Sequence, residues 1–176
     1  MSRLNWIQRF YWNHLSKPVA ERELVRTLLA SPLASVLEIG VGSGERMKRI
    51  SQLVQLPSTA THLRYVGVDG FESANDGRPH LTLKQAHQQA SHLGLKAHLI
   101  PGDLTTAMPR VAYKIGASDL VIVDGDFDMA NPLSGPVGHW LRHITHDQTI
   151  LFATSQKGGV LTRVALPQEN SQRVAA

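Results

Sequence analysis

Short apolar runs alternate with amphipathic stretches along most of this chain. Residues 45–55 and 81–93 place apolar side chains at the three- and four-residue spacing of a helix face. Five other runs have the length of β-strands and are apolar almost throughout: residues 35–39, 65–69, 97–100, 119–123 and 149–153. Strands without polar alternation, separated by helices, indicate a parallel sheet covered on both faces. We therefore predict a doubly wound, mostly parallel α/β domain.

The two ends of the chain depart from this alternation. Residues 3–30 indicate one or two helices, broken near Pro18, that precede the first strand. At the other end, the turn at 156–159 leads straight into the apolar run 160–166, and so short a connection permits only an antiparallel strand in a hairpin. The expected parts are an N-terminal helical arm at 1–34, a sheet domain at 35–166 and a loose polar tail at 167–176.

Composition narrows the classes of protein to which the chain can belong. Its 176 residues, 42% of them hydrophobic, suffice for one buried core. The absence of cysteine excludes a disulfide scaffold, a thiolate metal site and a cysteine nucleophile. The N-terminus lacks the pattern of a secretory signal, and no apolar run reaches the length of a membrane span. We therefore expect a cytoplasmic protein with no membrane partner.

Charge is distributed unevenly along the chain. The formal net charge is +4, yet eight of the fourteen acidic residues lie in or just after apolar runs that we interpret as strands. Lysine and arginine are instead spread over the helical stretches. The acids therefore indicate a site at the ends of the strands, whereas the basic excess is typical of a solvated surface.

The first predicted strand runs into a glycine-rich loop, Glu38-Ile-Gly40-Val-Gly42-Ser-Gly44, and a helix opens directly after it. Glycines at this place let a ligand approach the backbone closely. A nicotinamide or flavin dinucleotide site would have Gly-x-Gly-x-x-Gly, but Glu45 occupies the position of its last glycine and would face the pyrophosphate. This departure, with no Tyr-x-x-x-Lys pair downstream, argues against a nicotinamide-dependent reductase.

The segment from Glu38 to Gly44 resembles the first motif of class I S-adenosylmethionine-dependent methyltransferases. The resemblance continues through Asp69, Gly102-Asp103 and the run from Asp119 to Asp124, and it covers roughly residues 35–154. It implies a Rossmann-like sheet and the transfer of the cofactor's sulfonium methyl group to a nucleophile.

S-adenosylmethionine has a ribose diol, an ammonium and a sulfonium but no phosphate, so carboxylates around it would be favourable. Under this resemblance Asp69 would accept from both ribose hydroxyls, and Glu38 would face the ammonium. Asp103 would accept from the adenine amino group, with Phe71 or Leu104 as an apolar wall for the ring. The alternative for each acid is a structural one, in which it caps a helix or faces water.

Three carboxylates, Asp124, Asp126 and Asp128, follow the fourth predicted strand at alternate positions, beneath the expected place of the methyl group. They resemble the Asp-Gly-Asp of small metal-dependent O-methyltransferases, in which a divalent cation holds and deprotonates the acceptor. Such enzymes supply further ligands after the next strand, where this chain has Ala153-Thr-Ser-Gln156. We take Asp124 and Asp126 as candidate catalytic residues and do not favour a metal. A turn cap is the alternative role for Asp126 or Asp128.

The loop at 127–137 lacks the Asp/Asn-Pro-Pro-aromatic tetrapeptide of enzymes that methylate amino groups of adenine or glutamine. We therefore expect a small-molecule acceptor, methylated on oxygen or nitrogen. His139, His143 and Asp147 follow at helical spacing, and His139 is a candidate catalytic base. A polar helix side exposed to solvent is the alternative interpretation of these three residues.

Four of the ten aromatic residues lie among the first dozen positions, interleaved with Arg3 and Arg9. We interpret this segment as a lid over an acceptor pocket or a homodimer contact, in preference to a nucleic-acid surface. The candidates for a base are weak and the C-terminal part of the sheet is short. A methyltransferase-like module that binds S-adenosylmethionine or S-adenosylhomocysteine without catalysis therefore stays open as a second function.

Overall fold

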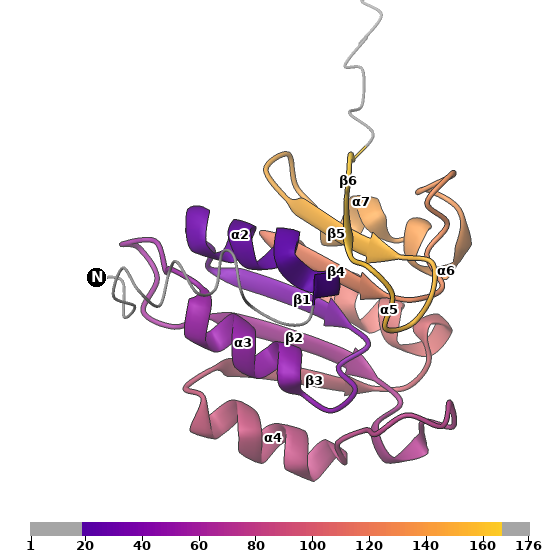
Figure 1. Cartoon of the computed structure of the whole chain (residues 1–176), viewed down its shortest axis with the longest axis horizontal. Helices are drawn as coiled ribbons and strands as arrows, with labels where there is room; N and C mark the ends of the chain where they lie inside the picture. The colour runs from indigo at the N-terminus through magenta and orange to yellow at the C-terminus, as the bar shows by residue number, and fades with distance from the viewer. Residues whose placement is uncertain (1–18, 167–176) are drawn as a thin grey trace, which may run out of the picture.

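The computed structural model describes residues 19–166, in which six strands form one sheet of order β3-β2-β1-β4-β5-β6 (Figure 1). β1 to β5 are parallel to their neighbours, and β6 is antiparallel to β5. The strands are β1 (Ser35–Ile39), β2 (Arg64–Asp69), β3 (Lys96–Pro101), β4 (Leu120–Asp124), β5 (Ile150–Thr154) and β6 (Thr162–Val164). The predicted Rossmann-like sheet with its C-terminal hairpin is confirmed.

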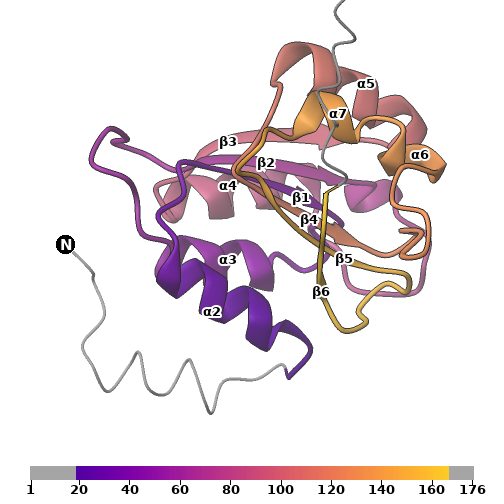
Figure 2. The same ribbon diagram turned by 90° about the horizontal axis from the view of Figure 1, so that it is seen from above.

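Helices cover both faces of the sheet (Figure 2). One layer contains η1 (Val19–Glu21), α2 (Arg22–Ala30), α3 (Glu45–Leu53) and α4 (Leu83–His92). The other layer contains α5 (Leu104–Lys114), α6 (Gly135–Gly138) and α7 (Leu141–Ile144). A short 3-10 turn, η2 (Phe71–Ser73), follows β2. Every residue of β1 and β4 is buried, which explains why these strands are apolar without alternation.

Two of the predicted helices begin or end within two residues of the expected positions. The capping box of Thr82 and Gln85 sets the start of α4, since each side chain bonds the backbone N–H of the other residue. In α2, Leu24, Val25 and Leu28 are buried, so the predicted apolar face of the N-terminal region packs into the core. Residues 1–18 and 167–176, which include the aromatic segment and the tail, lie outside the described residues.

Helix α5 was not predicted, because Pro109 lies in its interior and proline normally interrupts a helix. The helix is stabilised at its start by Asp103, whose side chain accepts a hydrogen bond from the Thr106 N–H at 2.8 Å. Its Met108 and Val111 side chains are fully buried against the sheet. Burial of this face compensates for the hydrogen bond that proline cannot donate.

None of the helices within residues 19–166 is both long and apolar enough to cross a bilayer.

Candidate functional site

The glycine-rich loop lies at the carboxyl ends of β1, β2 and β4. Gly40 and Gly42 both have positive φ angles, of 93° and 56°, which side chains other than glycine rarely adopt. A Cβ at Gly40 would also lie 3.0 Å from the Cβ of Asp124. The Gly42 N–H donates to Asp69 at 2.5 Å, and the Gly42 carbonyl accepts from the Leu81 N–H at 2.9 Å. The loop is therefore fixed between β2, β4 and the segment before α4.

A single guanidinium, that of Arg46 in the first turn of α3, joins three carboxylates at this loop. Its Nε donates to Glu21 at 2.9 Å, and its two Nη atoms donate to Glu38 and Asp124, each at 3.1 Å. Arg49 also pairs with Glu21. The side chain of Arg46 is only 11% exposed. Removal of one partner from a buried ion-pair cluster leaves charge that water cannot solvate, so the four groups depend on one another.

Glu38 is fully buried, and its burial raises the pKa of its carboxyl from 4.5 to about 7, although Arg46 and a hydrogen bond from Tyr65 act in the opposite direction. The same burial raises the pKa of the Tyr65 hydroxyl well above 10. Burial alone would lower the pKa of Arg46, but its carboxylate partners hold that pKa above the usual value. Arg46 thus stays charged, while Glu38 changes its protonation near neutral pH.

Asp69, the predicted ribose ligand, is buried at the end of β2 and has partners on both oxygens. Besides the Gly42 N–H, it accepts from the Phe71 N–H at 3.1 Å, and it lies 3.0 Å from Nδ1 of His80. The other ring nitrogen of His80 lies 2.8 Å from Asp76. This hydrogen bond with His80 is the main reason that the pKa of Asp76 is lowered. The imidazole therefore bridges the two carboxylates beside the loop.

The three aspartates after β4 do not form a common cluster. Asp124 is buried and accepts from Arg46 and, at 2.6 Å, from the Gly158 N–H. Asp126 is exposed and has a positive φ of 57°. Asp128 caps the following turn, where it accepts from the Asn131 N–H and from the Ser134 hydroxyl. Within residues 19–166, no group of three or more histidine or acidic side chains is arranged to hold a metal ion.

The other predicted site residues are placed as follows. Asp103 is exposed and caps α5, and this capping lowers the pKa of its carboxyl. Leu104 is half-buried in the first turn of α5, whereas Phe71, with a positive φ of 49°, is buried in the core. The expectation that His139 and Asp147 share a helix face with His143 is wrong, since α6 ends at Gly138 and α7 ends at Ile144. The His139 ring is exposed and has no carboxylate partner among the described residues. It packs edge-on against the ring of Trp140.

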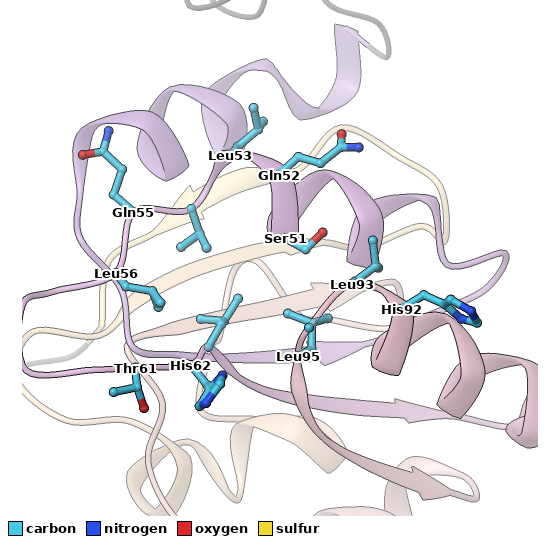
Figure 3. A pocket seen from close by; sticks show the side chains of 13 residues that line it. Ser51, Gln52, Leu53, Gln55, Leu56, Thr61, His62, His92, Leu93 and Leu95 are labelled. Carbon is cyan, nitrogen blue, oxygen red and sulfur yellow. The ribbon is translucent and has the colours of Figure 1, made fainter. Parts of the chain in front are cut away.

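A cavity of about 230 Å³ lies against the loop, lined by residues 40–43 and by Glu21, Glu45, Arg46, Arg49, Arg78, Pro79 and Asp124. The residues that line this cavity include both acidic and basic side chains. A larger groove of about 620 Å³ lies at the opposite ends of the strands, between the C-terminal ends of α3 and α4 (Figure 3). No lysine, arginine or acidic residue lines this second groove, so it has none of the charged groups that surround the loop.

The sequence did not point to Glu21, Arg46, Arg78 or His80 as members of this site. Glu21 is 25 residues from Arg46, and Asp124 is 78 residues from it. No local spacing indicates such contacts. The available signal was a charged residue, Arg46, immediately inside a helix that opens from a glycine loop next to a buried acid.

Comparisons with known proteins agree with this fold. A scan of protein-family models and a search of curated proteins both find no match to the sequence. Solved structures do match: the O-methyltransferase TomG from Streptomyces achromogenes, in complex with SAM, shares 16% identity over 80% of this chain, with a TM-score of 0.55. An O-methyltransferase from Bacillus cereus, in complex with SAH, shares 15% identity over 80% of this chain, also at 0.55.

The SAH-bound methyltransferase PaMTH1 from Podospora anserina shares 16% identity over 84% of the chain, with a TM-score of 0.52. The matched region covers 56%, 57% and 60% of those three proteins, respectively, so this chain spans little more than half of their length. At such identities the likeness shows a common fold, that of Rossmann-like methyltransferases.

Proposed function

We propose that this chain binds S-adenosylmethionine at the glycine loop and transfers its methyl group to an oxygen or nitrogen of a small molecule. One observation carries the proposal: Glu38, Asp69 and Asp124 come from three different strands and meet around the loop from Gly40 to Gly44. The order of strands reverses between β1 and β4, which is where doubly wound sheets bind ligands. Three arginines lie at the same point as the carboxylates, so the charges there suit a ligand that carries both an ammonium and a carboxylate, as S-adenosylmethionine does.

The charges of the smaller cavity suit the amino-acid end of such a cofactor. Asp124 would face its ammonium, and Arg49 and Arg78 would face its carboxylate. Glu38 does not line the cavity and is bonded to Arg46 and Tyr65, so it would reach the ammonium only if Arg46 gave up its bond to Glu38. The cavity of about 230 Å³ is smaller than the usual site for a whole cofactor-sized ligand. The ribose would then extend to Asp69, which requires His80 to yield one of its hydrogen bonds.

The adenine ring would lie beyond Asp69. Asp103 remains our candidate for its amino group and Leu104 for the apolar wall of the ring. Phe71, the other candidate for that wall, is buried in the core. Because Oδ1 of Asp103 accepts from the backbone N–H and the hydroxyl of Thr106 at the start of α5, the contact with adenine would be added to this capping role.

An acceptor methylated by the bound cofactor would give up one proton, which a residue of this chain must take. S-adenosylmethionine supplies the electrophilic methyl group. Asp126 is the exposed carboxylate after β4 whose side chain accepts no hydrogen bond from the described residues, so we assign it the role of proton acceptor. Asp124 is engaged by Arg46 and Gly158 and acts as a positioning residue.

The N-terminal arm at 1–34 is proposed as the cover of this site. Its described part supports the placement, because Glu21 lines the cavity at the loop and the Ala20 carbonyl accepts from the Leu161 N–H at 3.0 Å. The chain therefore arrives at the carboxyl edge of the sheet directly before α2. A lid or a homodimer contact remains the prediction for residues 1–18.

A catalytically inactive binding module is the second candidate, favoured by the lack of a histidine–carboxylate pair at His139 in the described residues. Calorimetric titration with S-adenosylmethionine, S-adenosylhomocysteine and NADH tests ligand binding, which both candidate functions require. We expect the first two ligands to bind and NADH not to bind. Binding of NADH alone would refute both candidates. Release of S-adenosylhomocysteine with a panel of phenols and amines separates the enzyme from the module.

Asp69→Ala is expected to weaken S-adenosylmethionine binding by roughly ten- to a hundredfold, because a bidentate, charge-assisted contact with the ribose is lost. The dissociation constant from the same titration provides the measurement. Asp147→Ala is the matched control, since this exposed carboxylate makes no contact with the loop. Equal affinities of the two variants would remove Asp69 from the site.

Chelation is expected to leave cofactor binding and turnover unchanged, because Asp124, Asp126 and Asp128 do not share a coordination site. The measurement compares the rate of S-adenosylhomocysteine formation before and after dialysis against EDTA. A rate that falls on dialysis and returns with added Mg²⁺ would show that the acceptor is activated by a metal, against our assignment of Asp126.

A further inference from the structure

Strand β3 forms one margin of the sheet, and its outer edge has no partner strand among the described residues (Figure 1). The Lys96 N–H donates to Leu63 and the Gly102 N–H donates to Asp69, each at 3.0 Å, so the even-numbered residues of β3 bond to β2. In a parallel pair, alternate residues turn their backbone groups to opposite sides. The N–H and C=O groups of Ala97 and Leu99 therefore face outward and are open to a further strand.

A groove of about 490 Å³ follows this edge between α4 and α5. The charged and titratable side chains that line it are all basic: Arg64, His87, His98, Arg110 and Lys114. Arg64 is engaged, since it donates to the carbonyls of Ile115 and Ala117 at the end of α5. Arg110 and Lys114 are exposed, lie one helical turn apart and form no ion pair with the described residues. Two like charges at this spacing repel each other, so an anionic partner would stabilise both.

We propose that β3 is the docking edge for an extended, acidic segment of a partner protein, which adds to the sheet as a further strand. The open backbone groups of Ala97 and Leu99 would pair with the main chain of this segment. Side chains of a strand alternate between the two faces, so acidic residues at every second position meet Arg110 and Lys114 on the α5 side. Pro101 has no N–H to donate and limits the pairing at the C-terminal end of β3.

An extended polypeptide fits these features better than a nucleic acid does. Both would be attracted by the basic groove, but only a polypeptide also uses the row of open N–H and C=O groups on the edge. The inference does not depend on the proposed methyl transfer, because β3 and its groove include none of the residues assigned to the cofactor loop.

The probe is a fluorescent peptide of about eight residues in which glutamate and valine alternate. We expect it to bind the full chain, and we expect the double variant Arg110→Glu/Lys114→Glu to bind it roughly tenfold or more weakly, as two ion pairs are replaced by repulsion. Arg26→Glu/Lys48→Glu is the matched control. It changes the net charge equally at exposed helix positions of α2 and α3 and should leave the affinity within about twofold.

Two further measurements separate strand addition from simple charge attraction. A peptide of the same sequence with alternate backbone amides N-methylated should not bind, because it cannot form the ladder. Hydrogen exchange at the Ala97 and Leu99 amides should slow when the unmethylated peptide is added. Equal binding of the methylated peptide, protection elsewhere in the chain, or no binding at all would overturn the proposal. Displacement of the peptide by single-stranded RNA at equal charge concentration, with the same two amides unprotected, would favour a nucleic-acid partner instead.

Discussion

Arg46→Met is expected to lower the free energy of unfolding by about 3–5 kcal/mol at pH 8. The substitution leaves Glu21, Glu38 and Asp124 close together and largely buried without their shared cation. The loss should be smaller at pH 5, where Glu38 is protonated and one of the three negative charges is absent. Urea denaturation of the wild type and the variant at the two pH values measures both effects.

Lys48→Met on the same helix is the control, since Lys48 is exposed and makes no side-chain ion pair with the described residues. Its stability should remain within about 0.5 kcal/mol of the wild type. In a Glu38→Gln background, Arg46→Met should lower the free energy of unfolding by less than it does in the wild type, because the ion pair between Arg46 and Glu38 is already absent. Equal midpoints for Arg46→Met and Lys48→Met would show that the guanidinium does not hold this cluster together.

The buried carboxyl of Glu38 is expected to make the fold less stable as the pH rises from 4.5 to 7. Its pKa is about 7 in the folded chain and 4.5 in the unfolded chain, so the folded state binds the extra proton in this interval. Stability contributed by the protonated form is fully present below pH 4.5 and is lost as the pH approaches 7. The loss amounts to about 3 kcal/mol, from 1.36 kcal/mol for each pH unit.

Other carboxyls titrate in the opposite sense, because Asp76, Asp103 and Asp128 have lowered pKa values. The quantity to measure is therefore the difference in unfolding free energy between the wild type and Glu38→Gln across this range. We expect the difference to favour Glu38→Gln increasingly with pH, whereas Glu72→Gln, at an exposed position, should not show this trend. A constant difference for Glu38→Gln would mean that the carboxyl stays ionised throughout.

The sheet could be predicted from the sequence because its central strands are buried on both faces, so each is a continuous apolar run. The glycine loop could also be predicted, because three glycines at alternate positions directly after a strand are typical of a loop that approaches a ligand closely. Helix α5 escaped prediction because Pro109 interrupts a pattern that only burial of Met108 and Val111 makes favourable. An element could thus be predicted where its local sequence pattern agreed with its burial in the fold, and was missed where the two disagreed.

The candidate site was only partly accessible from the sequence. Glu38, Asp69 and Asp124 were found because each lies at or next to the carboxyl end of a strand, and parallel strands bring these ends to one edge. The partners of these acids were not found, because Arg46 and His80 reach them through side chains and a loop that no periodicity describes. The helical spacing of His139 and Asp147 misled for the same reason, since the chain turns between α6 and α7.

The bond between Glu21 and Arg46 couples the first described helix to the loop in a thermodynamic sense. A ligand that draws Arg46 away from Glu21 would remove one of the two ion pairs that hold Glu21, at the end of η1, to α3. The coupling is reciprocal, so a force or a partner that shifts α2 alters the affinity at the loop.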